Sequence, residues 1–201
     1  MALPPSLARL VAAFKTLPGV GTRTAERLAF HVLRAPEAEA RELAEAIMAM
    51  RGSVLACSTC NTIAESDPCP VCADESRDRR RLLVVEQPRD VSAFEEAGWK
   101  GVYHVLLGHV NPLEGIEPGH LTIDALVARI EAGGVDEVVI GTNPDYEGDA
   151  TALHLRRRLP RTALQVSRIA RGIASGSAIE YSNAAMLADA LRGRARLEEA
   201  E

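Results

Sequence analysis

Aromatic residues are scarce in this sequence, since Phe, Trp and Tyr together make up 3% of its 201 residues. A protein that stacks single-stranded bases on a wide aromatic platform needs more of them. No apolar run approaches the ~20 residues of a membrane-spanning helix, and no basic and then apolar leader opens the chain. These absences favour a cytoplasmic protein with no membrane partner.

Positive charge is not in excess either. The chain has 23 Lys and Arg against 28 Asp and Glu, a formal net charge of −5, which taken alone argues against a generic nucleic-acid binder. The charge is uneven, however: residues 1–56 hold seven basic and five acidic residues and carry +2, so the remainder carries −7. The 47% of hydrophobic residues is a globular composition, enough for one domain or two small ones.

Hydrophobic periodicity changes along the chain. The first part has helical spacing, with helices expected over 6–16, over 22–34 with Thr22 as N-cap, and from Pro36 onward with an apolar stripe of Leu43, Ile47 and Met50. Strands are then expected over 82–85, 102–107, 137–142 and 163–169, and helices over 90–97, 122–132, 147–159 and 178–197. Such alternation predicts an α/β fold with a parallel sheet covered by helices.

All four cysteines lie in one short segment, as Cys57-x2-Cys60 and Cys69-x2-Cys72. Each pair can form a tight knuckle, and four thiolates suit one tetrahedral Zn²⁺ with no position left for a catalytic water. We therefore expect a structural zinc ion that stabilises a segment with little apolar content. The alternative, four free or disulfide-bonded cysteines, is less consistent with two pairs at this spacing.

Two glycines, Gly19 and Gly21, separate the first two expected helices. Glycine lets a backbone approach a partner closely, and the following helix points its free N–H groups at an anion such as a phosphate. On the second helix Arg23, Arg27 and Arg34 fall within about 40° of one another, opposite the apolar face. This pattern predicts a DNA-binding helix-hairpin-helix; the alternative is an ordinary helix turn with a solvated basic face. Phe30 lies on the arginine side, where it could stack on a base or contact a second subunit.

Acidic residues follow two expected strands at their carboxyl ends, the edge where open α/β sheets carry their sites. Glu86 ends one strand, and Asp145, Glu147 and Asp149 follow another. They could gather around Mg²⁺. The alternative is that they are acidic helix N-terminal residues favoured by the helix dipole. The basic run over 77–81 is interpreted as a solvated linker between the cysteine segment and the sheet, with a second DNA contact as the alternative.

A strand ending in Glu, followed later by an acidic loop with Glu-Gly-acid, resembles the Toprim domain of topoisomerases and primases, in which the carboxylates hold Mg²⁺. Here Asn143 replaces the first Asp of the pair, which lowers the expected metal affinity.

The order of hairpin, four-cysteine site, Toprim domain and C-terminal tail resembles the RecR family of bacterial recombination mediators. The shared stretches are residues 17–21, 27–30, 74–78, 103–106, 111–116 and 147–152, with the four cysteines. The resemblance implies a non-enzymatic repair protein that acts with RecO and RecF to place recombinase on gapped DNA. It also implies a ring-like tetramer lined by hairpins. Carried over, Arg23 and Arg27 face DNA, and Asp145 and Glu147 face RecO.

The resemblance also implies a division of the chain. We expect a hairpin domain over 1–53, a zinc finger over 54–76, a Toprim domain over 80–175 and a C-terminal tail over 176–201. Residues 173–185 depart from the family pattern, because the acidic pair expected after Tyr181 is missing, so the role of this stretch stays open. Two rival functions remain: a Mg²⁺-dependent Toprim nuclease using Glu86, Asp145, Glu147 and Asp149, and an assembly adaptor whose arginines bind protein.

Overall fold

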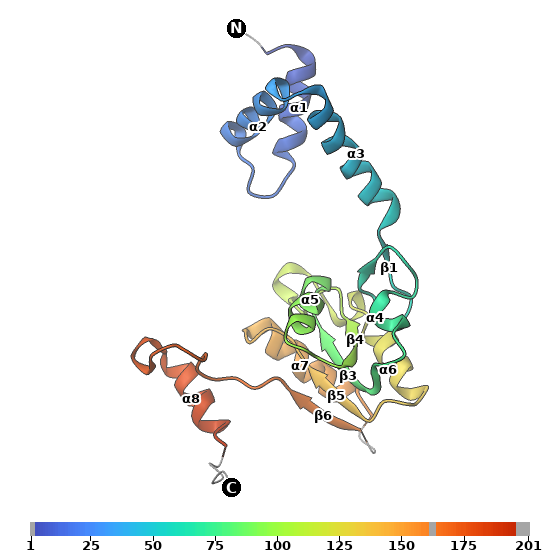
Figure 1. Ribbon diagram of the computed structural model, residues 1–201. Helices are drawn as coiled ribbons and strands as arrows, with labels where there is room; N and C mark the ends of the chain where they lie inside the picture. Colours follow the sequence, from blue (N-terminus) through green and yellow to red (C-terminus); the bar gives the residue numbers. More distant parts are fainter. Residues whose placement is uncertain (1–2, 161–163, 196–201) are drawn as a thin grey trace. The chain divides into compact units, whose positions relative to one another are not determined.

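The computed structural model describes residues 3–160 and 164–195, and the chain divides into two compact units, Met1–Val54 and Leu55–Glu201. The first unit consists of the helices α1 (Pro5–Lys15), α2 (Thr22–Arg34) and α3 (Glu37–Ser53) (Figure 1). Its core lies between α1 and α2 and is formed by the buried side chains of Leu7, Val11, Ala25 and Ala29. The apolar face predicted for α2 therefore packs, and the arginine face points away from the core.

The start of α2 corrects one expectation. Gly21, in an extended conformation, is the N-cap residue, and Thr22 is already helical. No side chain accepts a hydrogen bond at this helix end. Helix first-turn N–H groups have no partner within their own helix, so those of α2 are available to water or to an anion.

Helix α3 differs from the first two helices because it buries none of its residues. The predicted apolar stripe is present, but Leu43, Ile47 and Met50 are 46%, 51% and 51% exposed. The apolar row of α3 is therefore not part of the core of this unit.

The second unit begins with a small cysteine-containing module. A short antiparallel pair, β1 (Leu55–Ala56) with β2 (Ile63–Ala64), precedes the single-turn helix α4 (Pro70–Ala73). All four cysteines are buried and form the centre of this module, and in the described part of the chain the partly buried apolar side chains packed against them are Ala64 and Val71. The module therefore has almost no hydrophobic core of its own, as its composition predicts.

The rest of this unit is built on a parallel sheet, which confirms the predicted α/β fold. Its four strands are β3 (Asp78–Val85), β4 (Gly101–Val105), β5 (Glu137–Ile140) and β6 (Gln165–Arg168), arranged in the order β4-β3-β5-β6. The main helices are α5 (Pro88–Glu96), α6 (Ile123–Glu131) and α7 (Tyr146–Arg158). Short 3-10 turns lie at Pro112–Glu114, Pro118–His120 and Ile179–Tyr181.

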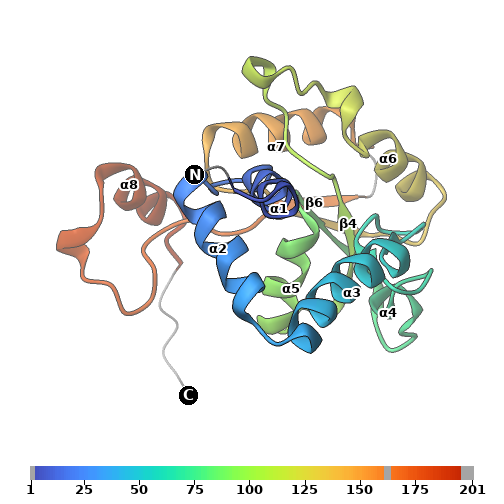
Figure 2. The ribbon, with the colours of Figure 1, turned by 90° about the horizontal axis from the view of Figure 1, so that it is seen from above.

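Helices cover both faces of the sheet (Figure 2). Leu82 and Val84 of β3 pack with α6 and α7, whereas Leu83 and Val85 pack with α5. This two-sided burial follows from the alternation of side chains along a strand, and it explains why residues 82–85 of the central strand β3 are all apolar.

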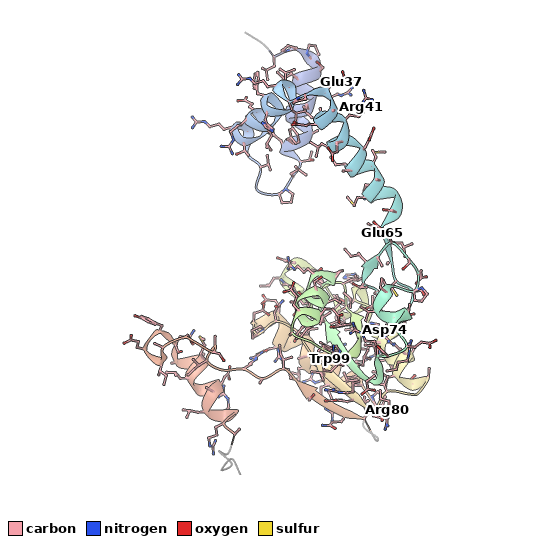
Figure 3. All side chains as sticks on the ribbon, in the orientation of Figure 1. Glu37, Arg41, Glu65, Asp74, Arg80 and Trp99 are labelled. Atoms are coloured by element: carbon pink, nitrogen blue, oxygen red, sulfur yellow. The ribbon has the colours of Figure 1, made fainter. Side chains whose placement is uncertain are left out.

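Residues 78–81 of the basic run are exposed, as predicted, but they belong to a strand, so the prediction of a linker is wrong. Strand β3 begins at Asp78, and Arg81 donates to Glu137 on β5 at 2.9 Å while its guanidinium lies 4.6 Å above the ring of Trp99. Arg80 pairs with Asp136, and Arg77 pairs with Glu95 (Arg80 and Trp99 are labelled in Figure 3). The strand is longer than predicted, because Asp78 pairs with Gly101 of β4 and Arg81 with Glu137 of β5 along the backbone.

The C-terminal helix is also shorter than predicted. Helix α8 spans Ala184–Arg192 rather than 178–197, of which 196 and 197 lie outside the described residues. Asn183 caps it by accepting from the Met186 amide at 2.9 Å, which sets its start. The predicted strand over 163–169 is observed as β6, with residue 163 outside the described part. Among the described helices, none is long and apolar enough to cross a membrane.

Candidate functional sites

The four cysteines of the second unit form a metal site. Their sulfur atoms all lie within 4.8 Å of one another, and those of Cys60 and Cys69 are 3.7 Å apart. A tetrahedral zinc ion with Zn–S bonds of about 2.3 Å needs sulfurs about 3.8 Å apart. The cysteines therefore fit Zn²⁺, and because four protein ligands fill its coordination, the ion is structural.

Backbone amides donate hydrogen bonds to two of the cysteine sulfurs, which stabilises the thiolate form. The Cys69 amide donates to the Cys57 sulfur at 3.3 Å, and the Cys72 amide donates to the Cys69 sulfur at 3.4 Å. Burial raises the pKa of Cys57, but amide hydrogen bonds led by that of Cys69 outweigh it and lower the pKa to about 7. Burial raises the pKa of Cys69 to about 11, so this ligand loses its proton when the metal binds.

The hairpin between α1 and α2 has glycines with different structural needs. Gly19 adopts φ +75°, a conformation that favours glycine, whereas Gly21 has the ordinary φ of −79°. A Cβ atom at either position would meet nothing within 4 Å. Gly21 is therefore not required by packing inside the chain, and the open space beside it leaves the backbone accessible to an external partner.

The predicted basic face of α2 is exposed. Arg23, Arg27 and Arg34 lie at the surface, and no salt bridge of the described residues involves them. Arg27 and Arg34 line a shallow hollow of about 290 Å³ with Phe30 and His31. By contrast, Arg41 on α3 is paired with Glu37 at 2.6 Å (Figure 3). The arginine face therefore combines solvent-exposed guanidinium groups with an uncapped helix start.

Glu86, at the carboxyl end of β3, is 1% exposed and is held by neighbours from other elements. It accepts hydrogen bonds from the backbone amide of Asn143 at 2.9 Å and from its side-chain amide at 2.6 Å. The Nδ1 atom of His109 lies 3.2 Å from the same carboxylate. Asn143, which replaces the expected Asp, therefore acts as a donor to Glu86 where a carboxylate would repel it.

The other acids at this edge have separate tasks. Asp145 is the N-cap of α7 and accepts from the Gly148 amide at 2.8 Å, so the helix-capping alternative holds for this residue. Asp149 pairs with Arg168 at 2.6 Å and with Arg171. Hydrogen bonding from Arg171 is the largest cause that lowers the pKa of Asp149. Glu147 is half-buried, beside the exposed Tyr146.

Within the described residues, the four cysteines are the only group of three or more His, Cys, Asp or Glu side chains close enough to share a metal ion. The structure therefore does not bring Glu86, Asp145 and Asp149 together as ligands of one magnesium ion. The sequence does not predict the roles of Arg168 and Arg171, whose guanidinium groups form ion pairs with the Asp149 carboxylate. Nothing in their local spacing indicates that pairing, because it joins residues about 20 positions apart.

Comparison with known families agrees with this division of sites. A model described as RecR, helix-hairpin-helix, matches residues 7–51, and one described as the RecR zinc finger domain with four cysteines matches residues 56–74. A Toprim domain model matches residues 80–170.

Whole-chain relatives extend the match. A recombination protein RecR of Rhodopirellula baltica is 49% identical over 94% of this chain and 95% of its own length. Those of Herpetosiphon aurantiacus and Moorella thermoacetica are 44% and 43% identical, over 95% and 98% of this chain and 94% and 100% of their own lengths. Identity of this degree over nearly the whole length shows that the chain belongs to the RecR family.

Proposed function

We propose that this protein is a non-enzymatic mediator of DNA recombination and repair that binds DNA without reading its sequence. The observation that carries this proposal is the α2 surface, where exposed arginines without an ion pair in the described part of the chain adjoin an uncapped helix start and an open glycine. These are groups that contact phosphate, and phosphate contacts position a protein on DNA without specifying bases. The relatives named as recombination proteins support the same role.

The test of the DNA surface is the double variant Arg23→Ala/Arg27→Ala. We expect its affinity for labelled duplex and gapped DNA to fall at least about tenfold at low salt, equally for unrelated sequences. The dependence of binding on salt should also flatten, by about 0.9 in the log–log slope for each phosphate that is no longer neutralised. Fluorescence anisotropy between about 50 and 200 mM salt measures both quantities.

Arg41→Ala is the matched control, because Arg41 belongs to the same unit but is paired with Glu37. It should bind DNA like the parent protein. If the double variant keeps its thermal stability and its full affinity at low salt, the assignment of this face to DNA is wrong.

DNA binding is proposed to require an oligomer, with a tetrameric clamp as the expected form. Residues 1–56 carry only +2, which is little charge for strong binding by one copy. The exposed apolar row of α3 supplies a surface for association. Light scattering with and without DNA should give the mass of a tetramer, and a stable monomer would exclude encirclement.

We further propose that this protein acts in the cytoplasm with RecO and RecF to load recombinase at single-stranded gaps. Asp145 and Glu147, at the start of α7, are the proposed RecO contacts. The double variant Asp145→Asn/Glu147→Gln removes both charges while the amide retains helix capping. It should lose RecO in a pull-down but keep DNA binding. Glu131→Gln, an exposed acid on α6, is the control, and retention of RecO by the double variant would refute these contacts.

The proposal includes no nuclease step. Glu86 and Asp149 already accept hydrogen bonds from Asn143 and from two arginines, which supports a role other than metal chemistry. Labelled gapped DNA incubated with the protein and Mg²⁺ should therefore stay intact. Nicking that Asp145→Ala abolishes would favour the enzyme instead.

A further inference from the structure

Two arginines of the second unit, Arg79 on β3 and Arg129 on α6, each form a hydrogen bond to one of the two cysteine knuckles. Arg79, near the start of β3, donates to the carbonyl oxygen of Cys72 at 3.0 Å. Arg129, on α6, donates to the carbonyl oxygen of Thr59 at 3.2 Å, between Cys57 and Cys60. Neither hydrogen bond follows from the DNA-binding or partner-binding role proposed above.

The first knuckle, from Cys57 to Cys60, also covers one edge of the parallel sheet. Strand β4 is an end strand, and its outward backbone groups need partners. The Val105 amide donates to the carbonyl oxygen of Cys60 at 2.8 Å. Arg129 donates to the carbonyl oxygen of Tyr103 at 2.7 Å while it holds Thr59. Arg129 therefore joins the edge strand to the knuckle.

The charge of the metal centre gives these arginines a second effect. Zn²⁺ with four thiolates carries a net charge of −2, and the cysteines that hold it are buried, so solvent screens this charge poorly. Two guanidinium groups carry +2. Arg129 is itself half-buried beside this centre, so solvent also screens the charge of its guanidinium poorly.

We propose that Arg79 and Arg129 are positioning residues that strengthen zinc binding, because they balance the charge of the zinc–thiolate centre and hold its knuckles on the β4 edge. Arg129 has the larger effect, because it is half-buried and bonds both the strand and the knuckle. Arg79 has the smaller effect, because its residue is exposed and it makes one such bond.

The experiment compares full-length, reduced, zinc-loaded variants by competition with a chromogenic zinc chelator. Loss of groups that support metal ligands typically weakens metal affinity about 10- to 100-fold, and we expect Arg129→Gln to fall in that range. Arg79→Gln should weaken zinc binding less. Arg129→Lys keeps the charge but not the planar guanidinium whose Nη1 donates to both carbonyl oxygens, so it should lie between Arg129→Gln and the parent protein.

Arg157→Gln is the matched control, since Arg157 is an exposed arginine of the same unit and should leave zinc binding unchanged. If Arg129→Gln and Arg79→Gln both bind zinc like this control, the proposal is overturned. If Arg129→Gln fails to fold, the zinc affinities of Arg129→Lys and Arg79→Gln test the proposal instead. The proposal is overturned if both bind zinc as tightly as Arg157→Gln does.

Hydrogen exchange tests the closed edge separately. After chelation of zinc from the parent protein, the Val105 amide should exchange much faster, whereas the Leu83 amide in the central strand β3 should change less. Equal acceleration at the two positions would show that the knuckle does not protect the β4 edge.

Discussion

Two groups of side chains in this chain are of the kinds that bind metals, and they are arranged in opposite ways. The four cysteines converge with their sulfurs facing one another, and the surrounding arginines bond carbonyl oxygens rather than sulfurs. The acids at the carboxyl edge of the sheet are instead bound by the chain itself, through Asn143, the Gly148 amide, Arg168 and Arg171. The comparison shows that a metal site depends on free, convergent ligand atoms and not on residue types alone.

The largest expected effect comes from disrupting the cysteine group. Cys57→Ser should lose the single zinc ion per chain and lower the free energy of unfolding by at least about 4 kcal/mol, because this module has almost no hydrophobic core. Elemental analysis of the purified protein and thermal unfolding measure the two effects. Thr59→Ser, in the same knuckle, keeps the ligands and should retain the metal. A full complement of zinc in Cys57→Ser would contradict the four-ligand assignment.

An intermediate effect is expected when a second carboxylate is introduced beside Glu86 at the carboxyl edge of the sheet. Asn143→Asp places a second carboxylate against the buried Glu86 and removes a 2.6 Å hydrogen bond. The free energy of unfolding should fall by about 3 kcal/mol in the absence of divalent ions, because the two like charges repel. Added Mg²⁺ should recover part of this loss, measured as a rise in melting temperature.

Asn183→Asp is the control for that experiment, because Asp caps a helix as well as Asn does and the change in charge is the same. Its melting temperature should not respond to Mg²⁺. If the parent protein gained as much stability from Mg²⁺ as Asn143→Asp does, the acids at the sheet edge would already form a metal site, and the contrast with the four cysteines would be wrong.

The smallest effect is expected at Asp149. Its folded-state pKa is lowered, chiefly by Arg171, so its ionised form stabilises the fold at neutral pH and this contribution is lost as the pH falls through the lowered pKa. Because its side chain is 48% exposed, solvent screens the pairs, and Asp149→Asn should cost less than about 1 kcal/mol at pH 7. Chemical denaturation at pH 7 and pH 3 should show the difference from the parent protein shrinking in acid. A difference that grows in acid would exclude the ion pairs as its source.

The parts of this protein that follow from short-range pattern are those that the sequence predicts well. The spacing of the cysteine pairs places two thiols on each tight turn. The apolar run at 82–85 and the mostly apolar stretch at 102–107 predict strands buried on both faces. The apolar face of α2 follows from helical periodicity at Ala25 and Ala29, which are both buried.

Interactions between distant positions could not be predicted in this way. Glu86 and Asn143 each follow a strand of the sheet, but the hydrogen bonds between them depend on side-chain geometry across 57 positions. The hydrogen bond of Arg129 with Thr59 spans 70 positions and depends on how α6 packs on the sheet. The pattern at 178–182 predicts helix from 178, whereas the helix begins at Ala184, after its N-cap Asn183.

The difference between the two hairpin glycines has a consequence for genetics. Any other residue at Gly19 must adopt φ +75°, which costs roughly 1–2 kcal/mol and lowers the amount of folded protein. A side chain at Gly21 meets open space and a permitted backbone conformation, so it leaves the fold intact and obstructs only an incoming partner. In a library of single substitutions scored separately for cellular abundance and for survival of DNA damage, Gly19 variants would be depleted in both screens and Gly21 variants in the second alone.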